Sequence, residues 1–188
     1  MDFKELCSQI NRNKSTKLHN YYQKLLVFLF INNKDPFDRV LRNISAEKRI
    51  GNGIVDIYAE WEKDGKRFDE IIEVELGGKK KNLESKIRLY SKKADLLSIC
   101  IPSKRLDSLI SIFPKMRKDL IKINIVYLID DEVVTKTRRK MTTDHKILVG
   151  AQSPFFIMKN KTNFAELKEI INSKKNLFFD ALLPIYLK

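Results

Sequence analysis

Three acidic side chains near the middle of the chain have the spacing expected of a site for a divalent cation. Asp56 lies in the segment GIVDIY, and Glu73 and Glu75 lie in IIEVEL. Both segments are rich in β-branched residues and predict neighbouring strands. Carboxylate oxygens are the ligands that Mg²⁺ prefers, usually together with oxygens of a substrate phosphate. This chemistry would suit hydrolysis of a phosphodiester bond.

The turn between the two strands sets their register. Asp64-Gly65 predicts a two-residue hairpin loop, so that Lys63 pairs with Lys66. Counting on from this pair puts Asp56 directly opposite Glu73, with Glu75 diagonal to Asp56. The same register pairs apolar residues on the other face, which is apolar apart from Glu70: Trp61 with Phe68, Ile57 with Ile72, and Val55 with Val74. A slip by one residue would bury charges, which supports this register.

A preceding strand contributes two further candidates. If its hairpin turns at Asn52-Gly53, Arg49 lies opposite Asp56 and Glu47 lies one step away on the same face. Glu47 is then a candidate outer carboxylate of the metal site. Arg49 is a candidate contact to a phosphate group.

A solvated strand face, with its acids balanced by Arg and Lys, would produce a similar pattern. On spacing alone this alternative is at least as good as a metal site. Three features favour the site: Asp56 has apolar neighbours in sequence, Glu73 and Glu75 lie inside an apolar run, and a basic segment follows directly. Directly opposed like charges also destabilise a sheet unless a cation lies between them.

The chain carries a net charge of +13, which favours a polyanionic partner such as DNA. A lysine-rich solvated surface is the alternative interpretation. The candidate nucleic-acid contacts besides Arg49 lie in two basic segments: Lys79, Lys80, Lys81, Arg138 and Arg139.

Several classes of protein are not indicated. The longest apolar run, Leu25 to Ile31, is too short to span a membrane, and we find no signal peptide. Two cysteines and two histidines make neither a disulfide framework nor a zinc site, and a lone histidine such as His19 is more often a surface or packing residue. No nucleotide-binding loop is found. We therefore expect a cytoplasmic protein without a membrane partner.

The order of predicted elements indicates an α/β fold with a mixed sheet flanked by helices. Helices are expected at 17–32, 79–93, 103–118 and 163–173, and strands at 43–50, 54–62, 67–76, 96–101 and 121–129, with two short strand pieces within 146–158. We expect a single domain, residues 1–188, with a core at about 17–130 and a C-terminal appendage at about 131–188. The apolar tail 177–187 has no assignment and is a candidate homodimer interface.

These residues resemble the PD-(D/E)XK nuclease superfamily, which has the restriction-endonuclease-like fold. The resemblance lies in EKRIGNGIVDIYAEW (47–61), IIEVELGG (71–78) and the helix that follows. It implies an αβββαβ core and metal binding by Asp56 and Glu73. The lysine expected two residues after the second acid is replaced by Glu75, which makes this an E-x-E variant. Glu75 would then act as a metal ligand or as a base.

In some members of that superfamily a lysine from the following helix replaces the missing one, and Lys86 is the best candidate here. A solvated lysine on a helix face is the favoured alternative for Lys86. The resemblance implies a Mg²⁺- or Mn²⁺-dependent endodeoxyribonuclease, a hydrolase of a mobile element or virus, acting on DNA. Two rivals are a non-catalytic nucleic-acid-binding module on the same fold and a structural partner protein of a mobile element.

Overall fold

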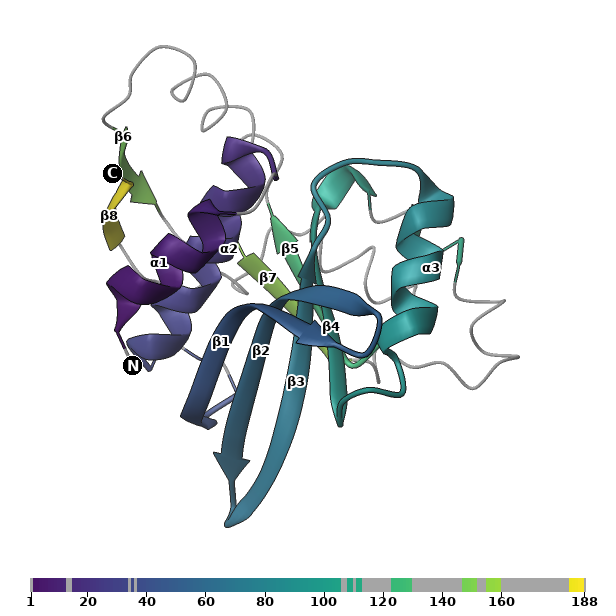
Figure 1. The fold of residues 1–188 in the computed structure, drawn as a ribbon, viewed down its shortest axis with the longest axis horizontal. Helices are drawn as coiled ribbons and strands as arrows, with labels where there is room; N and C mark the ends of the chain where they lie inside the picture. The colour runs from purple at the N-terminus through teal and green to yellow at the C-terminus, as the bar shows by residue number, and fades with distance from the viewer. Residues whose placement is uncertain are drawn as a thin grey trace.

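A six-stranded mixed sheet forms the centre of the protein, with helices on both of its faces (Figure 1). The computed structural model describes residues 2–12, 15–33, 35, 37–105, 108–109, 111–112, 123–129, 147–151, 155–159 and 183–187. The elements are α1 (Phe3–Asn11), α2 (Lys17–Ile31), β1 (Val40–Ile50), β2 (Gly53–Lys63), β3 (Lys66–Val74), α3 (Lys80–Tyr90), β4 (Leu96–Pro102), the short 3₁₀ helix η1 (Ser103–Arg105), β5 (Ile125–Ile129), β6 (Ile147–Ala151), β7 (Phe155–Lys159) and β8 (Leu183–Leu187).

The sheet has the strand order β1-β2-β3-β4-β5-β7. The first three strands are joined by two hairpins and are antiparallel. β3, β4 and β5 are parallel neighbours, with α3 in the connection from β3 to β4, and β7 closes the sheet in the antiparallel direction. β6 and β8 form a separate two-stranded sheet. The expected α/β class with a mixed sheet is therefore confirmed.

Helices α1 and α2 cover one face of the sheet. Thr16 caps α2, because its hydroxyl accepts a hydrogen bond from the amide of His19 at 3.2 Å. α2 is apolar over most of its circumference, as expected of a helix buried between a sheet and another helix. Its side chains form one cluster with the sheet residues Ile57, Trp61 and Ile72. The helix predicted at 17–32 is confirmed as α2, whereas α1 was not predicted.

Helix α3 covers the opposite face. Leu83, Ile87 and Tyr90 recur at helical spacing and are buried against the second apolar cluster of the sheet, which includes Val55 and Ile71. This packing fixes the rotation of α3 about its axis. It therefore decides which of the helix's polar residues face the edge of the sheet where β2 and β3 end.

One buried carboxylate, Glu70, belongs to the structure of the core. It accepts hydrogen bonds from Arg39 at 2.9 Å, from the Trp61 indole at 2.7 Å and from the Ser98 hydroxyl. The Arg39 guanidinium stacks over the Trp61 ring, 4.2 Å from its centroid, and also pairs with Asp35 at 2.6 Å. The charge of Glu70 is thus compensated inside the core, as a buried ion requires.

The C-terminal region contributes β7 to the central sheet, and part of the unassigned tail forms β8. After β4 the chain forms the short helix η1 (Ser103–Arg105), where the sequence predicted the start of a longer helix. The rest of that predicted helix lies largely outside the described residues, and the predicted helix at 163–173 lies entirely outside them.

Candidate metal and nucleic-acid site

The hairpin of β2 and β3 has the predicted register but ends earlier than predicted. Lys63 pairs with Lys66 and Ile57 with Ile72, which confirms the turn at Asp64-Gly65. The described ladder stops at the pair Ile57–Ile72, so the predicted pairs Asp56–Glu73 and Val55–Val74 are wrong. β3 continues alongside β4, with Val74 paired to Cys100, and β2 separates from it.

Asp56 and Glu73 lie where the two strands separate, and they hold the strands together through their side chains. The Asp56 amide donates to Glu73 Oε1 at 3.3 Å, and the Val74 amide donates to Asp56 Oδ2 at 2.7 Å. Asp56 is only 6% exposed and Glu73 is fully buried. The two acids are therefore neighbours, as predicted, although they are not a ladder pair.

In β2, the regular alternation of side chains between the two faces of the sheet is interrupted at Asp56. Ile57 packs in the cluster under α2, whereas Val55 packs in the cluster under α3. A regular strand would put both residues on one face, as the sequence analysis assumed. The neighbouring strand is irregular at the same level, because Glu47 has a φ of +54°. This irregularity puts Asp56 at the boundary between the two faces.

The predicted position of Arg49 is wrong. The first hairpin turns at Gly51-Asn52, so Ile50 pairs with Gly53 and Arg49 with Ile54. Gly51 has a φ of +58°, a conformation that glycine adopts readily, and this shifts the turn by one residue from the predicted one. Glu47 falls between the pairs Ala46–Ile57 and Lys48–Val55, at the level of Asp56.

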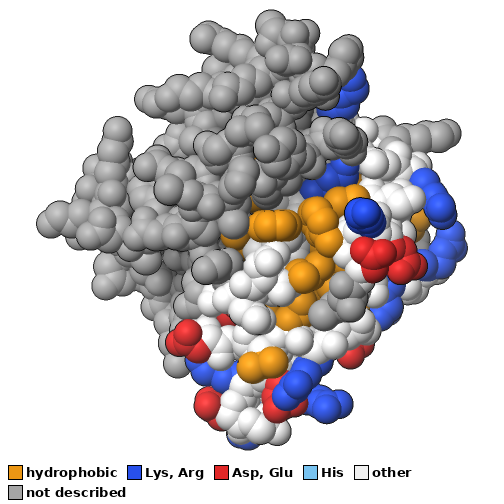
Figure 2. Space-filling model, turned by 90° about the vertical axis from the view of Figure 1, so that its left-hand side faces the viewer, with side chains coloured by type: hydrophobic (Ala, Val, Ile, Leu, Met, Phe, Trp, Pro, Cys, Tyr) orange, Lys and Arg blue, Asp and Glu red, His pale blue; other side chains and the backbone are white. Residues whose placement is uncertain are grey.

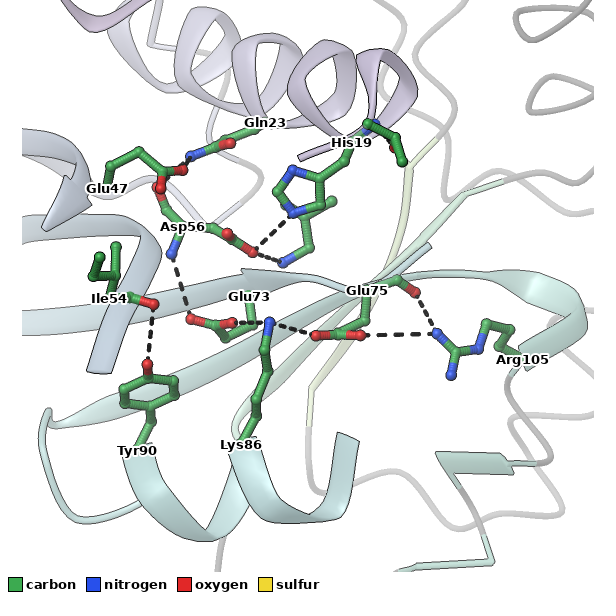
Figure 3. Close-up of polar contacts among 12 residues, drawn as sticks. His19, Gln23, Glu47, Ile54, Asp56, Glu73, Glu75, Lys86, Tyr90 and Arg105 are labelled. Carbon is green, nitrogen blue, oxygen red and sulfur yellow. Dashed lines mark hydrogen bonds and ion pairs between the residues drawn. The ribbon is translucent and has the colours of Figure 1, made fainter. Parts of the chain in front are cut away.

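Lys86 lies between two of the carboxylates. Its Nζ atom is 2.8 Å from Glu73 Oε2 and 2.5 Å from Glu75 Oε1 (Figure 3). The lysine is therefore not the solvated helix residue that the sequence analysis favoured. Its ammonium compensates two acids at once, and Glu75 keeps a more distant cation, Arg105, at 3.9 Å.

Arg105 fixes the loop that connects the acids to α3. It donates from Nη1 to the carbonyls of Glu75 at 2.9 Å and Gly77 at 2.6 Å, and from Nη2 to the carbonyl of Gly78 at 3.0 Å. A guanidinium can serve several carbonyls at once because its donors form a rigid planar fork. Arg105 was not among the predicted site residues, because it lies in a separate element after β4.

Helix α2 supplies two further residues to the site. The sequence predicted His19 to be a surface or packing residue, and Gln23 was not among the predicted site residues. His19 Nε2 lies 3.3 Å from Asp56 Oδ2, and Gln23 Nε2 donates to Glu47 Oε1 at 2.7 Å and to the Asp56 carbonyl at 2.6 Å. Figure 3 shows both side chains extending from α2 toward Asp56. His19 and Gln23 are four residues apart and so share one helix face, which was the signal available in the sequence.

These residues surround a pocket of about 570 Å³. Its lining includes His19, Glu47, Asp56, Glu75 and Lys86, together with the loop that Arg105 holds. Acidic and basic groups from α2, β1, β2, the segment after β3 and α3 therefore open onto one cavity.

Burial and charge alter the pKa values of the groups in the site. Burial, and secondly the charge of Asp56, raise the pKa of Glu73 to about 8, although Lys86 opposes the shift. Burial alone would lower the pKa of His19, but its hydrogen bond to Asp56 and the charge of Asp56 outweigh it and raise the pKa. For Lys86 the lowering by burial is likewise outweighed by Glu73 and Asp56, which raise its pKa. Perturbed groups of this kind are characteristic of functional sites.

The donor set fits a hard divalent cation chemically. Three carboxylates, Glu47, Asp56 and Glu73, come from three adjacent strands, and Glu75 follows the end of β3. Lys86 already holds one positive charge among them. Within the described part of the chain, no three acidic, histidine or cysteine side chains converge as in a formed metal centre. Lys86 occupies one oxygen of Glu73 and one of Glu75 in this arrangement.

Of the predicted nucleic-acid contacts, Lys79 and Lys81 are exposed at the start of α3, and Arg49 is exposed on the first hairpin. The side chain of Lys80 and the residues Arg138 and Arg139 lie outside what the structure describes. On the face shown in Figure 2, basic side chains lie in separate groups, several of them beside acidic ones. Among its described residues, this face is not one continuous basic surface.

Comparison of the chain with protein-family models, with curated proteins and with solved structures found no match. Among the described residues, no helix is long and apolar enough to cross a membrane. The chemistry of the site must therefore be inferred from its own residues.

Proposed function

We propose that this protein is a metal-dependent nuclease that hydrolyses phosphodiester bonds of DNA. The observation that carries the proposal is the position of Lys86, with its ammonium between Glu73 and Glu75 and beside a pocket that Asp56 lines. Two carboxylates on neighbouring strands, a third acid two residues on and a lysine nearby form a set suited to phosphodiester hydrolysis. The net charge of +13 favours a polyanionic substrate.

The order of elements supports the same proposal. The run α2-β1-β2-β3-α3-β4 has the αβββαβ order of the restriction-endonuclease-like fold, which the sequence resembles. We propose that the core adopts this fold and that the chain is a variant with Glu75 in place of the usual lysine. Lys86, which reaches the same place from α3, would compensate for that replacement.

Each residue has a role in this proposal. Asp56, Glu73 and Glu47 would hold Mg²⁺ or Mn²⁺, which supplies charge neutralisation at the phosphate and lowers the pKa of a water molecule. Glu75 would complete the set or accept a proton. Lys86 would keep a positive charge beside the scissile phosphate, and Lys79 and Lys81 would contact the backbone.

A test uses labelled linear, supercoiled and branched DNA with Mg²⁺, Mn²⁺ or EDTA. The wild-type protein should cleave at least one substrate with a divalent cation and none in EDTA. Asp56→Asn and Glu73→Gln should each lose more than about 100-fold in rate, the upper range for residues that only support a metal ligand. Glu62→Gln, at the far end of the same hairpin, should cleave normally. Normal cleavage by Asp56→Asn would refute the proposal.

A non-catalytic DNA-binding module is the second candidate. It is favoured by the ion pairs of Lys86, because Glu73 and Glu75 already have a cation in the absence of metal. This candidate predicts salt-dependent DNA binding that is the same with Mg²⁺ and with EDTA, and no cleavage under any of these conditions.

A further inference from the structure

Gln23 is a fully buried amide that links two of the proposed metal ligands. Its Nε2 group donates to Glu47 Oε1 at 2.7 Å and to the backbone carbonyl of Asp56 at 2.6 Å. Both partners are acceptors, and so only the NH₂ end of the amide can face them. The orientation of Gln23 is thereby determined.

Glu47 needs an external partner to hold its position. It lies inside β1 but has a φ of +54°, the left-handed region, which a non-glycine residue rarely adopts. Such conformations persist only where the surroundings stabilise them, and they are concentrated at functional sites. The regular pairs Ala46–Ile57 and Lys48–Val55 lie on either side, so the distortion is confined to the residue that faces Asp56.

Helix α2 contacts Asp56 at two points. His19 lies against the carboxylate at 3.3 Å, and Gln23, one helical turn later, holds the carbonyl of the same residue. The carboxylate and the backbone of Asp56 are therefore both fixed from a helix on the other side of the pocket from α3 (Figure 3). Partners of this kind orient a metal ligand before the ion binds.

We propose that Gln23, anchored on the carbonyl of Asp56, is a positioning residue that holds Glu47 in the pocket as an additional carboxylate ligand. This inference depends on the proposed metal-dependent function. It deepens that function, because it extends the site from the β2–β3 hairpin to β1 and α2. Gln23 itself does not touch the ion or the substrate.

The test measures Mn²⁺ affinity by isothermal titration of the full chain without DNA. Gln23→Met keeps the length of the side chain and removes the donor, and Glu47→Ala removes the carboxylate. Each should weaken Mn²⁺ binding by about 10-fold, because Gln23→Met releases Glu47 and Glu47→Ala removes the same ligand. The double variant should be no weaker than the single ones, because Gln23 acts through Glu47. Should Gln23→Met fail to fold, Gln23→Asn, which withdraws the amide by one methylene group, replaces it with the same expectation.

Lys24→Met is the matched control. Lys24 is the next residue of α2, is also buried, and makes a side-chain contact to Asn11 Oδ1 at 2.6 Å, away from the pocket. It should lower thermal stability without changing Mn²⁺ affinity.

The outcomes separate the two proposals. If the wild-type protein binds no Mn²⁺, the proposed function fails, and the inference fails with it. If the wild-type protein binds Mn²⁺ and the Gln23 variant binds as tightly as the Lys24→Met control, only the inference is overturned. Losses that add up in the double variant would also overturn it, since Gln23 would then not act through Glu47.

Discussion

The Lys86 ammonium lies 2.8 Å from the Glu73 carboxylate, where it supplies a positive charge to a fully buried acid. The lysine comes from α3 and the acid from β3, and Lys86 lines the pocket on the side opposite α2 (Figure 3). Lys86 is therefore placed to compensate the charges of both Glu73 and Glu75.

Replacing Lys86 with Met should make stability more dependent on metal. Loss of one partner of a buried ion pair costs about 3–5 kcal/mol. The Lys86 side chain is 39% exposed, so solvent screening should reduce the loss to about 1–2 kcal/mol. Urea unfolding with and without Mn²⁺ measures this, and the deficit should shrink with Mn²⁺ because the ion replaces the lost charge. Arg88→Met, which affects the surface pair with Glu84, is the control and should show no such dependence.

The pKa of Glu73 should give the protein a stability that falls as the pH rises. The folded protein holds the Glu73 proton up to a pKa of about 8, whereas the unfolded chain releases it near 4.5. Between these values the folded state binds more protons, so its contribution is complete below pH 4.5 and is lost as the pH rises through 8. Glu73 should lower the free energy of unfolding by at most about 1.4 kcal/mol for each unit of rising pH.

Glu73→Gln removes this titration and provides the comparison. The difference in unfolding free energy between the wild-type protein and the variant should change steadily from pH 5 to pH 8 in EDTA, in favour of the variant at the higher pH. Urea unfolding at four or five pH values would measure it. A constant difference over this range would show that the pKa of Glu73 is not raised.

Gly53 allows α3 to approach the first hairpin. A Cβ atom at this position would lie 2.2 Å from the Tyr90 hydroxyl, which donates to the Ile54 carbonyl at 3.0 Å. Gly53→Ala should therefore cost about 1–3 kcal/mol by overpacking. The cost should be smaller in a Tyr90→Phe background, which removes the clashing oxygen. Gly77→Ala, with open space around its Cβ position, should cost less, and thermal unfolding of the four variants and the wild type would test the coupling.

Arg39 should be essential for stability and irrelevant to metal binding. Arg39→Met would leave Glu70 buried without its cation, which should cost about 3–5 kcal/mol. Mn²⁺ affinity, measured below the unfolding transition, should stay unchanged because Glu70 lies in the core and outside the pocket. Arg42→Met, in an exposed pair with Glu62, should change stability little. A loss of Mn²⁺ affinity in Arg39→Met would link the core network to the site.

The sequence by itself determined the part of the site that depends on local rules. The turn at Asp64-Gly65 and the two-residue period of strands fix the β2–β3 register as far as the pair Ile57–Ile72, and Asp56 and Glu73 are the next residues of their strands. A one-residue change in the first turn, from Asn52-Gly53 to Gly51-Asn52, was enough to misplace Arg49, because every later pair depends on the turn.

Only the tertiary structure decided which distant residues complete the site. Lys86 was one of several lysines near the acids, and the burial of Leu83 and Ile87 under the sheet selects it by fixing the rotation of α3. His19 and Gln23 reach Asp56 because α2 packs across β2. Packing between elements far apart in the chain depends on the fit of whole surfaces, which the spacing of residues within one segment does not contain.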